Sequence, residues 1–459
     1  MGAMSEISCD VSVIGAGPAG EVAAGRLADG GLGVVVVENH LVAGECSYYA
    51  CMPSKALLRP GDLIDEARRI PGVKEALTGD IDVASALARR DEVIHDLDDS
   101  VQLPWLEDKG IRLVRGSGKL TGEKTVTAGE HEITALRAVV ISTGTRPAMP
   151  PIDGLADSSP WNNRDATTAK KAPASMLVLG GGPVGVEMAQ AWASFGTDVT
   201  LIDLDPRLLA REEPFAAEQV EKSLRERFGV EVVTGAKTTK VSREGGTVKL
   251  NLEDGREFVA EEILVATGRK PNSDDIGLDS VGVEADPFIG TDDRLRVGGR
   301  DWLYAIGDVN GRALLTHMGK YQAWAACENI LGRDTVATAE AAGSPRVTFT
   351  EPNVAAVGLT LDAALEKGIK ARAVDVDSNG SAGASFYGKD VEGTSRLVID
   401  TDTDCIVGAT FVGFETAEWV HAASIAMVGE VPLSRLRHAV PAFPSRSEVW
   451  LKLLEAAGR

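Results

Sequence analysis

The sequence is poor in basic residues, in cysteine and in long apolar runs. It has 47 Lys and Arg against 68 Asp and Glu, which gives a formal net charge of -21 over 459 residues. An acidic protein repels phosphate backbones and anionic lipid, so we expect no nucleic acid and no membrane partner. No apolar stretch reaches the roughly 18 residues that a membrane span needs, and we expect a cytoplasmic protein.

The five cysteines are too few and too scattered for a disulfide scaffold. Cys46 and Cys51 form a close pair with four residues between them. Two cysteines at this spacing can close a small loop, so the pair is a candidate redox centre. A structural disulfide or two buried thiols is the alternative interpretation. We expect no metal site.

One pattern occurs twice along the chain. Residues 11–14 and 176–179 are short apolar runs that predict buried strands. Each is followed by Gly-x-Gly-x-x-Gly, a helical stretch, and an apolar run ending in a carboxylate 18 residues after the third glycine. The residues are Gly15, Gly17, Gly20 and Glu38 in the first copy, and Gly180, Gly182, Gly185 and Asp203 in the second.

This context is the dinucleotide-binding fingerprint. The glycines allow a tight turn, close approach of a pyrophosphate and close packing of the helix, while the carboxylate binds ribose hydroxyls. Gly-rich turns in an ordinary α/β core are the alternative. Asp203 favours NADH, because a carboxylate there repels the 2′-phosphate of NADPH. Arg207 and Arg211 lie just downstream and could reverse this, so NADP(H) stays possible; solvated loop charges are the alternative for both.

A second matched pair consists of strands that end in Thr-Gly. Residues 139–144 end at Thr143 and Gly144, and residues 263–268 end at Gly268. Prolines soon after each strand mark plausible crossings between domains. Residues 303–308 predict another strand, and its terminal Asp308 could accept a ribityl hydroxyl of FAD or simply belong to a turn.

Residues 44–55 read Gly-Glu-Cys-Ser-Tyr-Tyr-Ala-Cys-Met-Pro-Ser-Lys. Pro53 suits the first turn of a helix, whose positive end would favour a thiolate at Cys51. Together with both fingerprints, the Thr-Gly strands and the segments 304–308 and 349–358, this segment resembles the flavin-dependent pyridine nucleotide–disulfide oxidoreductases. That family includes dihydrolipoyl dehydrogenase, glutathione reductase and mercuric reductase, and the resemblance covers nearly the whole chain.

The resemblance implies roles for individual residues. Cys51 would be the flavin-facing sulfur that forms a charge-transfer thiolate, and Cys46 would be the interchange sulfur that attacks substrate. Lys55 would lie by the flavin N5 and pair with Glu187, which places a positive charge where reduced flavin becomes negative. Ordinary helix-surface charges are the alternative for Lys55 and Glu187.

The C-terminal segment departs from the family pattern. The family has a His-Pro-Thr segment with a Glu four residues after the proline, and this His is the acid–base supplied across a dimer interface. Here we place Val440, before Pro441, at the position of the His, which implies about three inserted residues before Glu448. His438 could replace the missing base by a backbone shift, and Glu448 could keep a supporting role.

Two further features concern the substrate. Tyr48 and Tyr49, between the cysteines, could line an aromatic substrate cavity or simply pack. A second cysteine pair near the C-terminus is missing, which disfavours mercuric reductase and large thioredoxin reductase.

We therefore predict an α/β fold with two Rossmann-type dinucleotide-binding domains and an α+β C-terminal dimerisation domain. The predicted divisions are an FAD domain (1–151), an NAD(P) domain (152–271), a central domain completing the FAD site (272–342) and a dimerisation domain (343–459).

The leading hypothesis is an FAD-dependent NAD(P)H oxidoreductase of the dihydrolipoyl dehydrogenase type. It would be a homodimer that passes hydride from nicotinamide to FAD and on to the Cys46–Cys51 disulfide, with a small-molecule disulfide or a quinone as acceptor. One alternative is a quinone or dye reductase that uses the flavin directly. Another is a non-enzymatic redox-sensing flavoprotein.

Overall fold

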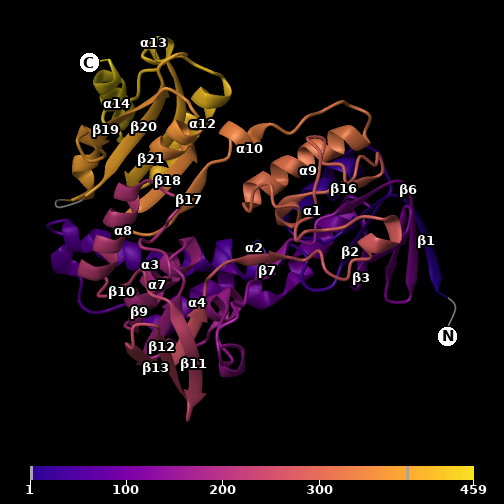
Figure 1. The fold of residues 1–459 in the computed structure, drawn as a ribbon, viewed down its shortest axis with the longest axis horizontal. Helices are drawn as coiled ribbons and strands as arrows, with labels where there is room; N and C mark the ends of the chain where they lie inside the picture. Colours follow the sequence, from indigo (N-terminus) through magenta and orange to yellow (C-terminus); the bar gives the residue numbers. More distant parts are fainter. Residues whose placement is uncertain (1–3, 389–391, 459) are drawn as a thin grey trace. The chain divides into compact units, whose positions relative to one another are not determined.

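The computed structural model describes residues 4–388 and 392–458, and these form two compact units (Figure 1). Each unit is assembled from three chain segments. The first unit comprises the residues up to Pro53, Asp91–Arg146 and Arg269–Glu340; the second comprises Ser54–Arg90, Pro147–Gly268 and the residues from Ala341 onward. This division is coarser than the four predicted domains, whose boundaries stay a prediction.

The first unit is built on a seven-stranded sheet in the order β3-β2-β1-β6-β5-β4, with β16 paired to β6. Strands β3, β2, β1, β6 and β16 run parallel, while β5 pairs antiparallel with both β6 and β4. The elements are β1 (Ser5–Ile14), α1 (Pro18–Asp29), β2 (Val34–Glu38), α2 (Gly44–Tyr48), α5 (Leu103–Asp108), β3 (Arg112–Arg115), β4 (Lys119–Gly122), β5 (Thr125–Ala128), β6 (His131–Ile141), β15 (Arg269–Pro271), β16 (Leu303–Ala305) and α9 (Thr316–Ile330).

The predicted βαβ unit is confirmed as β1, α1 and β2. All five residues of β2 are buried, as expected of an apolar run that is covered on both faces of a parallel sheet. Pro18 occupies the start of α1, where its missing N–H would have no helical partner. The carboxyl ends of β1, β6 and β16 meet at one edge of the sheet, which is where open α/β sheets bind ligands.

The second unit contains the second copy of the motif and the C-terminal sheet. A four-stranded parallel sheet has the order β10-β9-β8-β14, and a five-stranded antiparallel sheet has the order β17-β18-β21-β20-β19. The first group of elements is α4 (Val83–Val93, whose last residues belong to the first unit), α6 (Asn163–Thr168), β8 (Ser175–Leu179), α7 (Pro183–Ser194), β9 (Asp198–Ile202), α8 (Pro214–Glu226), β10 (Glu231–Val233), β11 (Thr238–Glu244), β12 (Thr247–Leu252), β13 (Glu257–Ala260) and β14 (Glu262–Val265).

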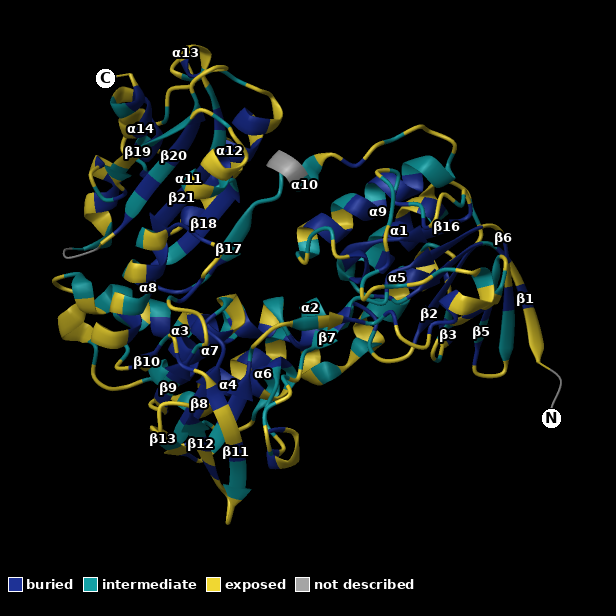
Figure 2. Ribbon diagram, in the orientation of Figure 1, coloured by how far each residue is buried: buried dark blue, intermediate teal, exposed yellow. Residues whose placement is uncertain are grey.

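The C-terminal elements surround an antiparallel sheet, as the predicted α+β domain requires. They are β17 (Arg346–Thr348), β18 (Asn353–Gly358), α11 (Leu361–Glu366), β19 (Ala371–Asp377), β20 (Thr394–Asp400), β21 (Cys405–Gly413), α12 (Thr416–Val428), α13 (Leu433–Leu436) and α14 (Val449–Ala457). Central strands β18 and β21 are largely buried, as their dark blue colour in Figure 2 shows. Within the described ranges, no helix is long and apolar enough to cross a membrane.

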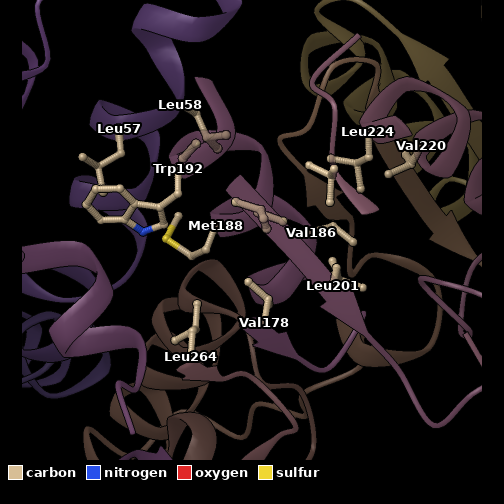
Figure 3. Packing of buried hydrophobic residues seen from close by; sticks show 14 of the residues in the cluster. Leu57, Leu58, Val178, Val186, Met188, Trp192, Leu201, Val220, Leu224 and Leu264 are labelled. Atoms are coloured by element: carbon tan, nitrogen blue, oxygen red, sulfur yellow. The ribbon is translucent and has the colours of Figure 1, made fainter. Parts of the chain in front are cut away.

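Helix α3 (Cys51–Arg69) begins in the first unit and continues into the second. In the second unit its Leu57 and Leu58 pack with Met188 and Trp192 of α7 in a buried cluster (Figure 3). Burial of side chains this size contributes about 1.5–3 kcal/mol each. This packing fixes α3 against α7, and both helices carry residues of the candidate site.

Candidate active site

The two glycine loops have the same local geometry. Gly15 and Gly180 have φ values of 100° and 111°, a region that only glycine enters readily. A Cβ on Gly20 would collide with the carbonyl of Gly15, and the equivalent clash occurs between Gly185 and Gly180. Each helix can therefore pack against its strand only because the third residue is glycine.

The second glycine of each loop faces open space. A Cβ built on Gly17 or on Gly182 would have no heavy atom within 4 Å. This is the space that a pyrophosphate needs beside the helix N-terminus. Both predicted glycine sets are therefore placed as a dinucleotide site requires.

The carboxylates at the ends of the second strands brace these loops. The N–H of Ala16 donates to Glu38 Oε2 at 2.7 Å, and the N–H of Gly181 donates to Asp203 Oδ2 at 3.0 Å. Glu38 also accepts from the N–H of His40 at 2.7 Å. Burial raises the pKa of Asp203 above its ordinary value. The two copies thus repeat the same loop–carboxylate arrangement.

Polar groups gather where β6 and β16 end, close to the first loop. The Thr145 hydroxyl donates to Asp308 Oδ2 at 2.9 Å, and burial raises the pKa of Asp308. Thr143 and Gly144 are held by Asn272, whose side chain donates to the carbonyl of Thr143 at 2.8 Å and whose N–H donates to that of Gly144 at 2.9 Å. An open glycine loop and the carboxylates of Glu38 and Asp308 are a set of groups that fits FAD.

Gly268 lies at the matching place in the second unit. Its φ is 147°, and its carbonyl accepts a hydrogen bond from Ala148 at 3.0 Å. It therefore allows a backbone turn after β14. The segment before this turn lies close to the glycine loop, since a Cβ on Gly180 would collide with the carbonyl of Ala266.

Cys46 lies in the short helix α2, and Cys51 is the first residue of α3. Cys51 Sγ lies 3.4 Å from Thr316 Oγ1 at the start of α9. Cys51 thus lies at the N-terminal ends of two helices, α3 and α9, and the positive ends of their dipoles favour an anion. A hydrogen bond with Cys51, together with burial, raises the pKa of Cys46. Of the two sulfurs, Cys51 is the one placed to carry negative charge.

Lys55 and Glu187 form the predicted ion pair. Lys55 Nζ lies 2.7 Å from Glu187 Oε2, and the Lys and Glu side chains are 36% and 6% exposed. The other carboxylate oxygen accepts the N–H of Phe349 at 2.9 Å, and the ammonium lies 4.6 Å from the centre of the Phe349 ring. A carboxylate this well buried and doubly bonded is not an ordinary surface charge.

The predicted register of the C-terminal segment needs correction. A second proline, Pro444, lies four residues before Glu448, which is the spacing we expected, and it follows Phe443. The three-residue insertion inferred from Pro441 is therefore unnecessary, and Phe443 rather than Val440 stands before the matching proline. Val440 and Phe443 are 81% and 77% exposed.

Glu448 and His438 have different surroundings in the structure. The Glu448 carboxylate accepts the N–H groups of Ser445 and Gly383 at 3.3 and 3.2 Å, and with Ser445 it forms a capping box on the 3-10 turn Arg446–Glu448, directly before α14. His438 is exposed just after α13, and its N–H donates to the carbonyl of Arg435. The corrected spacing does not bring His438 to the base position.

Tyr48 and Tyr49 pack rather than line an open cavity. Both are buried in a small cluster with Ala43 and Ile94, and the Tyr49 hydroxyl lies 2.8 Å from His40 Nε2. The aromatic substrate cavity suggested by their spacing is therefore wrong, and packing is the correct interpretation.

Sequence reasoning missed Thr316 and Phe443. Phe443 carries a usable signal, since the four-residue spacing from Pro444 to Glu448 is visible in the sequence. Thr316 carries none, because it lies 265 residues from Cys51 and meets it only in the fold. In the part of the chain that the structure describes, no group of three or more His, Cys, Asp or Glu side chains could hold a metal ion.

Two dinucleotide loops and a cysteine pair, one cysteine in α2 and the other at the start of α3, define a flavoprotein disulfide reductase. The chain belongs to the pyridine nucleotide–disulphide oxidoreductase family. The family model matches residues 9–330, and the model of the family's dimerisation domain matches residues 344–454. Members are FAD-dependent NAD(P)H–disulfide oxidoreductases, so the non-enzymatic hypothesis is not supported.

The chain is similar to several characterised proteins over most of its length. It is 34% identical over 453 residues to the dihydrolipoyl dehydrogenase of Chlorobaculum tepidum, covering 96% of this chain and 95% of that enzyme. It is 29% identical to a mercuric reductase of Lysinibacillus sphaericus, covering 92% and 78%. Among solved structures, the HOCl-induced flavoprotein disulfide reductase RclA of Escherichia coli matches with a TM-score of 0.86 at 25% identity, covering 97% and 99%. LpdA of Mycobacterium tuberculosis matches with a TM-score of 0.86 at 23% identity, covering 99% of both chains.

Proposed function

We propose that this protein takes hydride from NADH, reduces its own Cys46–Cys51 disulfide through FAD, and then passes two electrons to a small-molecule acceptor. The observation that carries the proposal is the cysteine pair, with Cys46 in α2 and Cys51 at the start of α3, where Thr316 lies beside Cys51. The dihydrolipoyl dehydrogenase and mercuric reductase relatives support the same class of chemistry.

The candidate site residues have separate tasks in this proposed reaction. Gly17 and Glu38 would hold the pyrophosphate and ribose of FAD, and Asp308 would hold its ribityl chain. When bound, FAD accepts a hydride from the nicotinamide and returns two electrons to a disulfide. Lys55, held by Glu187, supplies positive charge at that step. Glu187 fixes the ammonium because a charge-assisted hydrogen bond is directional and strong.

Reduction breaks the Cys46–Cys51 bond and adds two electrons and one proton. Cys46 keeps the proton, because its pKa is raised by the hydrogen bond with Cys51 and by burial. Cys51 keeps the negative charge, next to Thr316 and the two helix ends. Cys46 must then lose its proton before it can attack a disulfide substrate.

That deprotonation lacks the base that the family resemblance led us to expect. Phe443 occupies the position before the proline and has no group that titrates. A positioned general base contributes about 10²–10⁴-fold to such a step. We therefore propose that reduction by NADH is fast, while turnover with lipoamide or glutathione disulfide is slow.

A quinone acceptor is the second candidate, and the absence of a titratable side chain at Phe443 favours it. A quinone takes electrons and protons without an attacking thiolate, so the loss of an imidazole would not slow its reduction. The exposed side chain of Phe443 offers an apolar surface for a flat ring where the family pattern has a polar base.

The coenzyme proposal is NADH. Asp203 accepts the N–H of Gly181 in the glycine loop, and a carboxylate at this point of the fingerprint binds a ribose diol and repels a 2′-phosphate. The experiment is a comparison of steady-state rates with lipoamide, glutathione disulfide and a quinone, each measured with NADH and with NADPH. A rate with lipoamide on the order of 10² s⁻¹, well above the ~10 s⁻¹ typical of enzymes, would refute the missing-base argument.

A further inference from the structure

A short segment after β9 controls what surrounds the adenosine ribose. We call residues 203–213 the coenzyme loop. It starts at Asp203, packs Leu208 and Leu209 into the core, and ends where α8 begins. The N–H of Leu209 donates to the carbonyl of Gly181 at 2.9 Å, so the loop touches the glycine turn itself.

Arg207, which could have served a 2′-phosphate, is turned inward on the loop. One of its terminal nitrogens donates to the carbonyl of Glu212 and the other to that of Ala210, both at 2.8 Å. A planar guanidinium with two backbone acceptors is held in a fixed direction. Arg207 therefore braces the loop.

The end of the coenzyme loop is pinned to the C-terminal sheet by two adjacent carboxylates. Glu212 binds Arg346 in a bidentate ion pair, with distances of 2.6 Å from Nε and 2.9 Å from Nη2. Arg346 belongs to β17, outside the dinucleotide-binding sheet. The pair is largely shielded from solvent, so salt screens it less than a surface pair.

Glu213 makes the second attachment. Its Oε2 accepts from Arg396 of β20 at 2.9 Å, and its Oε1 accepts the N–H of Leu361 at 2.8 Å. The Glu213 carboxylate is almost fully buried. Loss of one partner from a buried pair is strongly destabilising, because it leaves an uncompensated charge.

We propose that Glu212 and Glu213, with Arg346 and Arg396, form a latch that sets coenzyme selectivity. The latch fixes the backbone of the coenzyme loop, whose carbonyls retain Arg207 away from the ribose. With Arg207 retained, Asp203 meets the ribose hydroxyls without that guanidinium beside it, and NADH is selected. Opening the latch loosens the carbonyl acceptors, and the guanidinium becomes free to reach a 2′-phosphate. The four residues are specificity-determining positioning residues and touch no coenzyme atom.

This inference rests on the proposed use of NADH. The wild-type preference tests that proposal, and the change in preference between variants tests the latch. The main variant is the double substitution Glu212→Gln and Glu213→Gln, which removes both charges and keeps the side-chain shapes. The matched control is Lys237→Met, which removes an exposed 2.6 Å pair with Glu253 in the same unit.

The measurement is kcat/KM for NADPH divided by kcat/KM for NADH, with ferricyanide as acceptor. The latch predicts a ratio at least about tenfold higher in the double variant, a difference of about 1.4 kcal/mol, with no change in Lys237→Met. Adding Arg207→Met to the double variant should return the ratio to the wild-type value. A loop that is only structural would weaken both coenzymes equally, and an unchanged ratio would overturn the latch.

Arg207→Met in the otherwise wild-type protein gives a second test that does not depend on the double variant folding. The latch predicts that NADPH use does not fall relative to NADH, because Arg207 is already held on the loop. A selective tenfold loss with NADPH would show that Arg207 contacts the phosphate in the wild type, and the inference would be wrong.

Discussion

Lys55 Nζ lies 2.7 Å from Glu187 Oε2, and these residues stand 132 positions apart in the sequence. Helix α3 brings the lysine and helix α7 brings the glutamate, and packing of Leu57 and Leu58 against Trp192 joins the two helices. The carboxylate also holds the N–H of Phe349, so three distant segments meet at one charge. The position of the Lys55 ammonium is therefore determined by packing between distant segments and not by the sequence around it.

Replacing Glu187 with Gln should slow reduction of the bound flavin by NADH. The amide can still accept the N–H of Phe349, but it leaves the ammonium of Lys55 without its counter-charge. A charge-assisted hydrogen bond contributes about 1.5–3 kcal/mol, which corresponds to roughly 10–100-fold in rate. Stopped-flow absorbance of the flavin measures the rate. Asp29→Asn, which breaks the exposed pair with Lys109, is the control and should leave it unchanged.

Placing an imidazole before Pro444 should restore disulfide turnover. Phe443→His would put a general base where the corrected spacing requires one, and we expect the lipoamide rate to rise at least about tenfold, within the range of general-base catalysis. Steady-state NADH oxidation with lipoamide is the assay.

Two matched variants test that register. Val440→His puts the same side chain before Pro441, the position predicted from the sequence, and His438→Ala removes the native imidazole nearby. Neither should change lipoamide turnover. A gain in Val440→His without one in Phe443→His would show that Pro441 is the matching proline, and a loss in His438→Ala would reassign the base to His438.

We predict a homodimer, because residues 344–454 match a dimerisation domain. Helix α12 exposes Ile425 and Val428, which suits burial against a second copy. Ile425→Arg should shift the protein toward monomer in light scattering at micromolar concentration. A wild type that is monomeric under the same conditions would contradict the prediction.

Stability should fall as pH rises from about 4 to about 7 because of Asp62. Burial raises the pKa of this α3 carboxyl to about 7, with Glu187 adding to the rise and Arg59 opposing it. The folded protein then holds a proton that the unfolded chain releases, so the unfolding free energy decreases through this window. The effect is at most about 4 kcal/mol, from 1.36 kcal/mol for each unit of pKa.

Asp62→Asn removes this titration and keeps an oxygen for the side chain of Gln190, which donates to Asp62 at 3.1 Å. The difference in melting temperature between pH 4.5 and pH 7.5 should shrink in the variant, at fixed FAD concentration. The exposed Asp80→Asn is the control and should follow the wild type. An equal pH response in Asp62→Asn and wild type would show that Asp62 is ionised in the fold.

The sequence predicted both dinucleotide units because their signals are local. The strand, the three glycines and the carboxylate lie within residues 11–38 in one copy and 176–203 in the other, and the requirement for glycine at Gly15 and Gly20 comes from backbone geometry alone. Strand β9 therefore ends at Ile202, directly before the predicted carboxylate of Asp203.

The rest depended on contacts between distant segments. Nothing near Arg207 in the sequence reveals that its guanidinium would bind the carbonyls of Ala210 and Glu212, or that Arg346 would hold that glutamate. Tyr48 and Tyr49 could not be told from cavity residues, because burial of an aromatic side chain is decided by what packs on it. The prediction for the C-terminal segment was wrong for another reason. Two prolines, Pro441 and Pro444, precede Glu448, and the prediction took the first as the family's proline although only the second lies four residues before the glutamate.

The most direct test of the proposed function is an anaerobic titration of the purified protein with NADH. We predict that the wild type takes up two equivalents per FAD, one for the Cys46–Cys51 disulfide and one for the flavin. After the first equivalent a long-wavelength absorption band should arise from the Cys51 thiolate beside the oxidised flavin. Cys46→Ser should take up one equivalent and show the band before any reductant is added, and Cys51→Ser should take up one equivalent without the band. Uptake of a single equivalent by the wild type, with no difference from the Cys51→Ser variant, would contradict a redox-active cysteine pair.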